Sequence, residues 1–338
     1  MPRMRMNQAI TAALADEMRD DPTVVLFGED VAATGGVFRT SEGLLDEFGP
    51  MRVRDTPISE MAIIGAAVGA AVNGLRPVAE IMFAEFYGVA LDQIVTQAAK
   101  LHYLTYGQVT VPLVTRGSVG AGRGFGATHS QTCETWFLAT SGLKIVHVST
   151  PQNAYGLLRS AIRDDNPVVF LEPRVLYGDR AEVMTGEAGI IPLGQAHIAR
   201  QGSDVTIISL GQMVPVALEA AQILADRQID AEVIDLQTLR PWDRFAVMSS
   251  AARTRRLVVV EENPMTGGWG TEIAAAVGSE LFGELSAPVH RVTTPDVPVP
   301  FNKNLEFTYL PSAVNVAGQI SSLCETGVRP KSWWEALV

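Results

Sequence analysis

Runs of consecutive apolar residues, rich in valine and isoleucine, alternate along this chain with segments of helical period, and this alternation limits the possible folds more than any other feature. The runs show no polar alternation, which is typical of strands in a parallel sheet that is covered on both faces. In the first half they lie at Val24–Phe27, Val78–Met82, Val111–Thr115, Lys144–Val148 and Val168–Leu171. Helices are expected between them at Asn7–Arg19, Glu60–Val72, Phe86–Leu104 and Pro151–Arg163. We therefore predict a doubly wound α/β domain.

A second series of the same kind follows a turn-rich passage that ends near Gln201–Asp204. Its strands are expected at Val205–Leu210, Ala231–Leu236, Leu257–Val260 and Val289–Val292, and its helices at Pro215–Asp226, Asp243–Ala252 and Gly270–Leu281. A chain of 338 residues with 47% hydrophobic content exceeds the usual size of a single core. We predict a first domain over 1–190, a linker over 191–202 and a smaller α/β domain over 203–338.

The composition excludes several classes of function. The net charge is −11 and no run of Lys and Arg forms a basic stripe, so no nucleic acid partner is expected. No segment reaches the ~20 apolar residues that span a bilayer, so no membrane partner is expected either. The two cysteines, Cys133 and Cys324, are far apart and have no CxxC spacing, which disfavours a zinc site or a disulfide framework and indicates a reducing cytoplasm.

The segment that begins at Glu60 is apolar on every face up to Val72, so this helix is expected to be buried all round. Ser59 is a suitable N-cap. Gly65 and Gly69 lie on one face and each costs about 1 kcal/mol relative to Ala, a cost that close packing against another subunit would explain. Glu60 is a candidate for proton chemistry, but an acid in the first turn is also favoured by the helix dipole alone, by about 0.3–1 kcal/mol.

A loop with four glycines, Gly120–Gln131, carries His129, whose side chain type suits proton transfer near neutral pH. A histidine in such a loop is also compatible with a plain surface position. Residues 122–127 loosely match a dinucleotide fingerprint. No helix opens at once and no acid stands about 20 residues on, so nicotinamide binding is a disfavoured alternative. The role of Arg123 is open.

Several short motifs together resemble one family. Glu60, Gly65-Ala66 and Gly69-Ala70 look like the signature of the pyrimidine-binding domain of thiamine diphosphate enzymes. The other segments that contribute to the resemblance are Thr56–Ser59, Phe83–Phe86, Asp92–Ile94, His129–Gln131, Pro151 and Asp164–Pro167. This set is similar to the beta subunit of the decarboxylating component of 2-oxoacid dehydrogenase complexes, which includes pyruvate, branched-chain 2-oxoacid and acetoin enzymes. Asp235–Asp243 and Val260–Asn263 resemble its transketolase-like C-terminal domain, so the resemblance covers essentially the whole chain.

The resemblance implies roles for four residues. Glu60 would be catalytic and cofactor-binding, since it would exchange a proton with the N1′ nitrogen of the thiamine pyrimidine ring. Apolar neighbours would raise its pKa by desolvation and ease that exchange. Ile58 and Phe86 would contact the cofactor, although Phe86 is also compatible with an ordinary core position. His129 would be catalytic, helping to transfer the acyl group to a lipoyl arm.

Members of the family often hold a monovalent cation, and the resemblance implies a possible potassium site here. Its ligands would be Leu113, Ala161, Ile162, Asp164 and Asn166. Carbonyl and carboxylate oxygens suit such a hard cation. The turn-forming residues 164–166 before Pro167 are also compatible with a helix end that needs no ion.

The diphosphate half of a thiamine site is missing from the sequence. Neither a Gly-Asp-Gly string nor an Asn-Asn string occurs. The resemblance therefore implies an alpha subunit that holds the magnesium and the diphosphate, an alpha2beta2 heterotetramer, and a lipoylated dihydrolipoyl acyltransferase as the acceptor. A non-catalytic assembly subunit of the same fold is the alternative. Pyruvate, a branched-chain 2-oxoacid and acetoin all stay open as substrates.

Overall fold

The computed structural model describes residues 1–337, and the chain divides into two compact units. Unit 1 contains residues 1–119, 136–193 and 239–241, and unit 2 contains residues 120–135, 194–238 and 242 onward. These bounds correct the predicted ones in two ways. The expected linker 191–202 includes strand β9 (His197–Arg200), which pairs with β11 (Ala231–Asp235) in the sheet of unit 2. The glycine loop that carries His129 also groups with unit 2 instead of with the first domain.

Unit 1 is built on a seven-stranded sheet whose strands from β6 to β3 are all parallel. In spatial order the strands are β12 (Thr238–Arg240), β6 (Lys144–His147), β7 (Val168–Pro173), β5 (Val114–Val119), β4 (Arg76–Phe83), β2 (Val24–Gly28) and β3 (Val53–Asp55). The predicted parallel α/β class is confirmed. The predicted strand at Val111–Thr115 is shifted in the structure to Val114–Val119.

The helices of this part of the chain follow the predicted order. They are α1 (Met6–Asp20), α2 (Leu44–Phe48), α3 (Glu60–Val72), α4 (Tyr87–Leu91), α5 (Ala99–Leu104), α6 (Glu134–Leu138) and α7 (Pro151–Arg163). A π-helix, η2 (Asp92–Ala98), joins α4 to α5, and short 3₁₀ helices lie at η1 (Ala84–Phe86), η3 (Arg174–Gly178) and η4 (Glu187–Gly189). A two-stranded antiparallel ribbon pairs β1 (Arg3–Arg5) with β8 (Arg180–Glu182).

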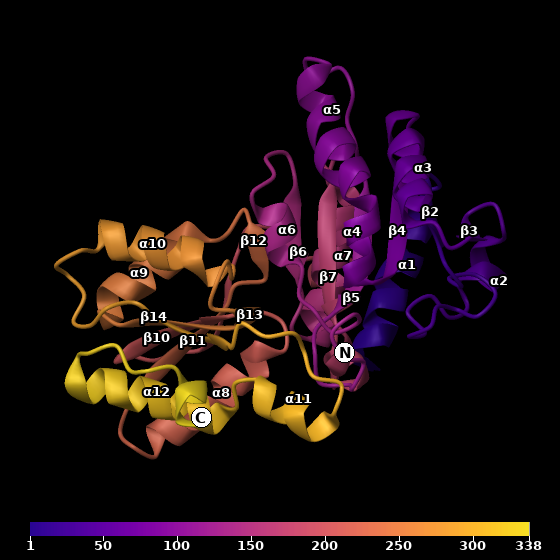
Figure 1. The fold of residues 1–338 in the computed structure, drawn as a ribbon. Helices are drawn as coiled ribbons and strands as arrows, with labels where there is room; N and C mark the ends of the chain where they lie inside the picture. Colours follow the sequence, from indigo (N-terminus) through magenta and orange to yellow (C-terminus); the bar gives the residue numbers. More distant parts are fainter. Residues whose placement is uncertain (338) are drawn as a thin grey trace. The chain divides into compact units, whose positions relative to one another are not determined.

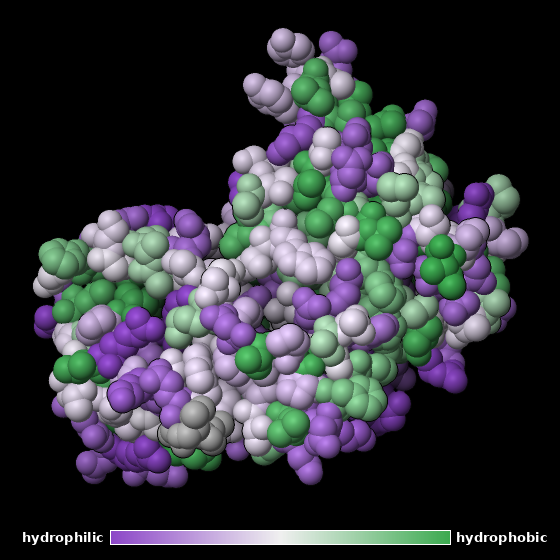
Figure 2. Space-filling view, in the orientation of Figure 1, coloured by the Kyte–Doolittle hydropathy of each residue, from purple (hydrophilic) through white to green (hydrophobic). Residues whose placement is uncertain are grey.

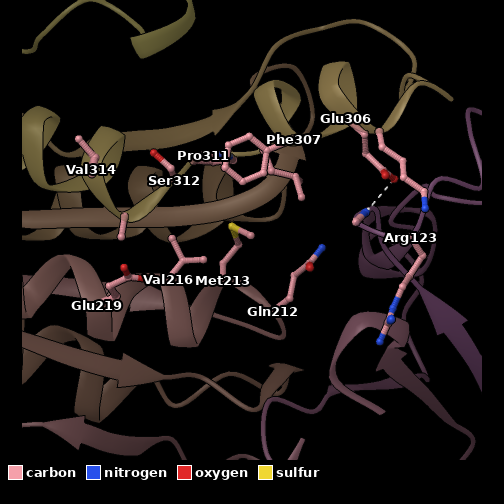
Figure 3. Close-up of a pocket in the computed structure, with 14 residues that line it drawn as sticks. Arg123, Gln212, Met213, Val216, Glu219, Glu306, Phe307, Pro311, Ser312 and Val314 are labelled. Carbon is pink, nitrogen blue, oxygen red and sulfur yellow. Dashed lines mark hydrogen bonds between the residues drawn. The ribbon is translucent and has the colours of Figure 1, made fainter. Parts of the chain in front are cut away.

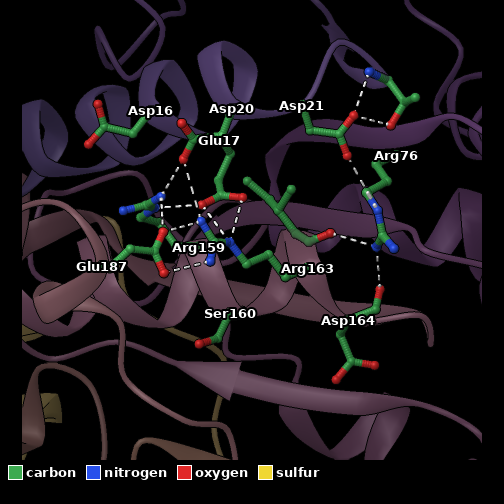
Figure 4. A network of polar contacts seen from close by, with 12 residues as sticks. Asp16, Glu17, Asp20, Asp21, Arg76, Arg159, Ser160, Arg163, Asp164 and Glu187 are labelled. Carbon is green, nitrogen blue, oxygen red and sulfur yellow. Dashed lines mark hydrogen bonds and ion pairs between the residues drawn. The ribbon is translucent and has the colours of Figure 1, made fainter.

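Helices α1 and α7 are joined by a buried ion-pair cluster as well as by apolar packing (Figure 4). The guanidinium of Arg159 is buried and its Nε donates to Glu17 Oε1 at 2.5 Å. Arg163 Nε donates to both carboxylate oxygens of Glu17 at 2.9 Å, and Arg159 Nη2 donates to Asp20 at 2.9 Å. Because a buried carboxylate is tolerated only when it is paired, Arg159 and Arg163 explain how Glu17 is accommodated in the helix interface.

Unit 2 has a five-stranded sheet in the order β14 (His290–Thr294), β13 (Leu257–Pro264), β10 (Val205–Ser209), β11, β9, and only β9 runs antiparallel. Figure 1 shows α9 (Arg244–Thr254) and α10 (Gly270–Glu280) on one face of this sheet, and α8 (Met213–Ala225) and α12 (Ala313–Thr326) on the other. The short helix α11 (Lys303–Tyr309) precedes α12, and η5 (Trp333–Leu337) follows it. The second α/β domain is confirmed.

None of the helices formed by residues 1–337 is long and apolar enough to cross a membrane.

Candidate functional site

The strand order of unit 1 creates a topological switch point between β2 and β4. The chain passes from β2 to β3 on one side and then returns to β4 on the other. Ligands of open parallel sheets bind beyond the carboxyl ends of the strands at such a point. Glu29 directly follows β2, and Phe83 is the last residue of β4. The fold therefore directs attention to the segments that follow these two strands.

Glu60 is the first residue of α3 and follows the carboxyl end of β3 at this same edge. The residue is buried, with only 8% of its surface exposed. The expected burial of this carboxylate is thus confirmed. The expected cap is wrong, because the Ser59 side chain makes no capping hydrogen bond.

Helix α3 is not buried all round in a single chain, contrary to the prediction. Ile63 and Ile64 are buried, but Met61 is 52% exposed, and a Cβ added at Gly69 would meet open space. Ile58, just before the helix, is 83% exposed. Figure 2 shows exposed hydrophobic side chains among polar ones over the part of unit 1 where α3 to α5 lie in Figure 1. The apolar sequence of α3 predicts burial on every face, but within this chain one part of the helix surface stays exposed.

Glu29 is a candidate that the sequence analysis missed. Its pKa is raised above the usual value, first by desolvation and then by the charges of Glu60, Asp30 and Glu80. The loop after Glu29 is held to the end of β3, because Asp55 accepts hydrogen bonds from the backbone N–H groups of residues 32 and 33 at 2.7 and 3.2 Å. The available signal was the position of an acid directly after the buried strand β2.

Phe86 lies in an aromatic cluster beyond the end of β4. Its ring packs edge-on against Phe83 with 5.8 Å between centroids, and Phe83 packs in the same manner on Phe38 at 5.7 Å. The guanidinium of Arg174 lies 4.7 Å from the centroid of Phe83. Phe86 itself is half-buried.

Tyr87, which follows Phe86 in the sequence, lies in the core of unit 1. The residue is fully buried, and its ring packs edge-on against Phe137 at 5.3 Å. The hydroxyl of Thr115 donates to the Tyr87 hydroxyl at 3.1 Å. A Cβ at Gly117 would lie 2.9 Å from the Tyr87 ring, so the strand needs glycine there for the ring to fit. Tyr87 is a core residue.

A buried charge network lies behind the switch point, in the middle of the sheet. Arg116 on β5 makes a two-pronged ion pair with Glu172 on β7, with both N–O distances at 2.7 Å, and a further ion pair with Glu80 on β4. The Tyr177 hydroxyl donates to Glu172 at 2.7 Å. Burial opposes the charge of Arg116, but Glu172 and Glu80 raise its pKa. Desolvation is the main cause that raises the pKa of Glu80, and Arg116 only partly offsets it.

His129 lies in unit 2, on the glycine loop, and is half-buried. Its backbone N–H donates to the carbonyl of Gly126 at 3.2 Å, and its Nδ1 lies 2.9 Å from the Thr128 hydroxyl oxygen. Four glycines of this loop, at 120, 122, 124 and 126, have positive φ angles between 73° and 103°. Such a conformation turns successive N–H groups toward one side and creates an anion-binding concavity.

Two buried carboxylates of unit 2 accept hydrogen bonds from the backbone of the loop. Glu262 on β13 accepts from the N–H of Ala121 at 2.6 Å, and Glu306 on α11 accepts from Gly122 and Gly124 at 2.8 and 2.7 Å. Carboxylates of the protein itself thus bind loop N–H groups that a phosphate in a dinucleotide site would need. The next helix, α6, begins only at Glu134. These two findings leave the nicotinamide alternative without support.

The five residues of the predicted cation site cluster at the amino-terminal ends of β5 and β7, which is the sheet edge opposite to the switch point. Several of their oxygens accept hydrogen bonds from the chain. The Leu113 carbonyl accepts from the N–H of residue 168 at 2.8 Å, and Arg76 Nη1 donates to the carbonyls of Ile162 and Asp164 at 3.0 and 3.2 Å.

The Asp164 carboxylate is also occupied. Lys144 pairs with one oxygen, while the backbone and side-chain N–H groups of Asn166 donate to the other at 2.9 and 3.0 Å. Burial raises the pKa of Asp164, but the hydrogen bonds from Lys144 and Asn166 outweigh it, so the pKa is lowered. Ala161 contributes its carbonyl to the N–H of Asp164 at 3.3 Å. The set is compact, and an ion bound to it stays a prediction.

Comparisons with known proteins agree with this architecture. The family described as transketolase, pyrimidine binding domain, matches residues 3–180, and the transketolase C-terminal domain matches residues 194–316. The chain is 44% identical to the pyruvate dehydrogenase E1 component subunit beta-2, mitochondrial, of Oryza sativa, over 96% of this chain and 87% of the relative. It is 45% identical to the acetoin:2,6-dichlorophenolindophenol oxidoreductase subunit beta of Cupriavidus necator, over 93% and 96% of the two chains. It is also similar to a solved split-gene transketolase described as an inactive beta4 tetramer, with a TM-score of 0.78, 25% identity, and coverage of 95% and 98%.

Proposed function

Because the chain belongs to the family of transketolase-like beta subunits that includes those of the pyruvate dehydrogenase E1 component and of the acetoin oxidoreductase, we propose that it is the beta subunit of a thiamine-diphosphate-dependent 2-oxoacid or acetoin dehydrogenase. The observation that carries this proposal is the buried carboxylate of Glu60 at the switch-point edge of a pyrimidine-binding domain. Its partners would be an alpha subunit, in an alpha2beta2 heterotetramer, and a lipoylated acyltransferase.

The residues present fit one half of the coenzyme. Glu60 offers a carboxylate for the N1′ nitrogen of the pyrimidine ring, and the half-buried ring of Phe86 offers an aromatic face. The hydroxyl of Thr56 is buried and has no hydrogen-bond partner within residues 1–337, which supports a ligand at this edge. Ile58 would contact the same ligand from the exposed side.

Bound thiamine diphosphate supplies the electron sink that allows the carbon–carbon bond next to the substrate carbonyl to break. The residues of this chain would hold and transfer protons. Glu60 would exchange a proton with N1′. Glu29 lies close enough for the charge of Glu60 to contribute to the raised pKa of Glu29, after desolvation. His129 would assist acyl transfer to the lipoyl arm.

Magnesium and the diphosphate would be held by the alpha subunit. The exposed apolar side chains Ile58 and Met61 beside Glu60 support a second chain at this edge. The similar split-gene transketolase that is described as an inactive beta4 tetramer gives a precedent for a chain of this fold that lacks activity by itself. A potassium ion at the Asp164 cluster and a location in the cytoplasm complete the proposal.

The test is reconstitution of the heterotetramer with Glu60→Gln. We expect decarboxylation, followed with an artificial electron acceptor, to fall by at least about 100-fold, because the glutamine cannot exchange a proton. Glu42→Gln, which changes an exposed acid of the same unit, is the matched control and should leave turnover unchanged. Turnover like the wild type in the Glu60 variant would end the assignment of this residue.

Two further measurements separate the alternatives. Purified alone with thiamine diphosphate and magnesium, the chain should be inactive, and robust turnover would refute the half-site. An assembly subunit without catalytic function would give a heterotetramer whose activity is unaffected by changes at both Glu60 and His129. A panel with pyruvate, branched-chain 2-oxoacids and acetoin would identify the substrate.

A further inference from the structure

The glycine loop of unit 2 is held by a carboxylate that lies far away in the sequence. Glu306 is 184 residues from Gly122 and 182 from Gly124, and one oxygen of its carboxylate accepts from each of these two N–H groups. The Glu306 side chain is buried although α11 lies at the surface of the unit. Hydrogen bonds from N–H groups to a carboxylate are roughly twice as strong as neutral ones.

Glu306 closes one end of a cavity of about 680 Å³ that lies between the loop, α8 and the segment 303–314 (Figure 3). Met213, Val216 and Phe307 supply apolar wall, while Arg123 and Glu219 are also part of its lining. In Figure 3 the carboxylate of Glu306 points at the loop, where the dashed line joins it to a loop N–H group. Glu306 thus joins the wall of this cavity to the glycine loop.

The rest of the loop is fixed in a related way. Glu262 accepts from the N–H of Ala121, and Gln212 donates to the Ala121 carbonyl at 3.3 Å. Beyond His129, the Asn263 side chain donates to the Thr132 hydroxyl at 2.8 Å. Between these anchors, the carboxylate of Glu306 binds the N–H groups of Gly122 and Gly124, whose φ angles are 103° and 74°.

We infer that Glu306 is a positioning residue, which sets the geometry of the loop through the N–H groups of Gly122 and Gly124 and thereby aims His129 at the acyl acceptor. The role of His129 in acyl transfer rests on the proposed function. The fixing of the loop by Glu306 does not depend on it. Since a misplacement of about 1 Å can cost about 100-fold in rate, loosening the loop should reduce the step that needs His129 and spare the step that needs Glu60.

The experiment compares two activities of the same reconstituted heterotetramer. In Glu306→Gln, an amide N–H₂ group replaces one of the two acceptor oxygens, so one loop N–H loses its partner. We expect transfer of the acyl group to a lipoylated domain to fall at least about tenfold, and turnover with an artificial electron acceptor to stay within about threefold of the wild type. Glu219→Gln, an exposed acid of the same cavity, is the control and should change neither activity.

A second measurement does not depend on activity. Hydrogen exchange of the N–H groups of Gly122 and Gly124 should become at least about tenfold faster in Glu306→Gln, which matches the loss of one charged hydrogen bond. Glu306→Asp keeps the charge but is one methylene shorter, so it should show the same selective defect if the glutamine variant fails to assemble.

Three outcomes are decisive. Unchanged lipoyl transfer, or an equal fall in both activities, would overturn the inference. Unchanged exchange at Gly122 and Gly124 would overturn it as well, whatever the activities. If the wild-type heterotetramer turns over none of the 2-oxoacids or acetoin, the proposed function fails instead, and hydrogen exchange still tests whether Glu306 fixes the loop.

Discussion

Removing the guanidinium of Arg116 should destabilise unit 1 in a pH-dependent manner. In Arg116→Leu, the carboxylates of Glu80 and Glu172 stay in the middle of the sheet without their common cation. Arg116 and Glu172 are almost fully buried, and Glu80 is only 5% exposed. Water therefore cannot replace the lost partner without opening the sheet.

The magnitude follows from this burial. Breaking a buried ion pair by removal of one partner costs about 3–5 kcal/mol, because an uncompensated charge is left behind. For a domain of this size class each kcal/mol lowers the Tm by about 2–4 °C, so a fall of about 6–20 °C is expected.

The sign of the pH dependence follows from the carboxyl group of Glu80. Burial already raises the pKa of Glu80 while Arg116 is present, and without this cation the pKa should rise further. The folded variant would then bind more protons than the unfolded chain, so its stability falls as the pH rises through the raised pKa of Glu80. The variant should therefore be closest to the wild type at about pH 5 and furthest from it at about pH 8.

Thermal unfolding of wild type and variant at these two pH values is the assay. The matched control is Arg39→Leu, which breaks an exposed ion pair with Glu42 and should cost less than about 1 kcal/mol at either pH. A loss below about 1 kcal/mol in Arg116→Leu, or an equal loss at both pH values, would contradict the reasoning about a buried and unpaired charge.

Two further predictions concern packing and titration. Gly117→Ala should destabilise unit 1 by about 1–3 kcal/mol, since its Cβ would lie 2.9 Å from the ring of Tyr87, whereas Gly178→Ala meets open space and should be neutral in the same thermal unfolding assay. In unit 2, burial raises the pKa of Glu261 to about 7, with Arg291 offsetting part of the effect. The stability that this group contributes is present below its unfolded pKa and is lost as the pH rises through about 7. Glu261→Gln should therefore flatten the fall in Tm between about pH 5 and 8. An unchanged slope would show that other groups cause the fall.

The sequence alone predicted the regular elements well where apolar periodicity was strong. The bounds of α3 and α7 agree with the predicted ones at both ends. The strand β5 was misplaced, because beyond the predicted end at Thr115 it contains Arg116 and Ser118, which look like surface residues in a linear pattern. Their burial depends on partners from neighbouring strands, such as Glu80 and Glu172, and no local pattern contains that information.

The candidate site shows the same limit. Glu60 was found because its motif is local, and the acid directly after β2, Glu29, could have been found by the rule that ligands gather at strand ends. The two carboxylates that hold the glycine loop, Glu262 and Glu306, are 141 and 184 residues from their partners in the loop. Glycine spacing in the loop suggested a phosphate, and only the tertiary structure shows that the anion is a side chain of the protein itself.

Helix α3 connects assembly with chemistry. Gly69 costs about 1 kcal/mol relative to alanine in a helix interior, yet within this chain a Cβ there would meet nothing, so the cost has no compensation in the isolated unit. Met61 is half exposed on the same helix, one residue from a carboxylate that the unit buries. A partner backbone against Gly69 would offset the cost, cover the apolar surface and fix the axis that sets the position of Glu60. Helix α3, whose apolar surface is only partly covered within this chain, is therefore also the helix that carries Glu60. A partner that covered this surface would also complete the site.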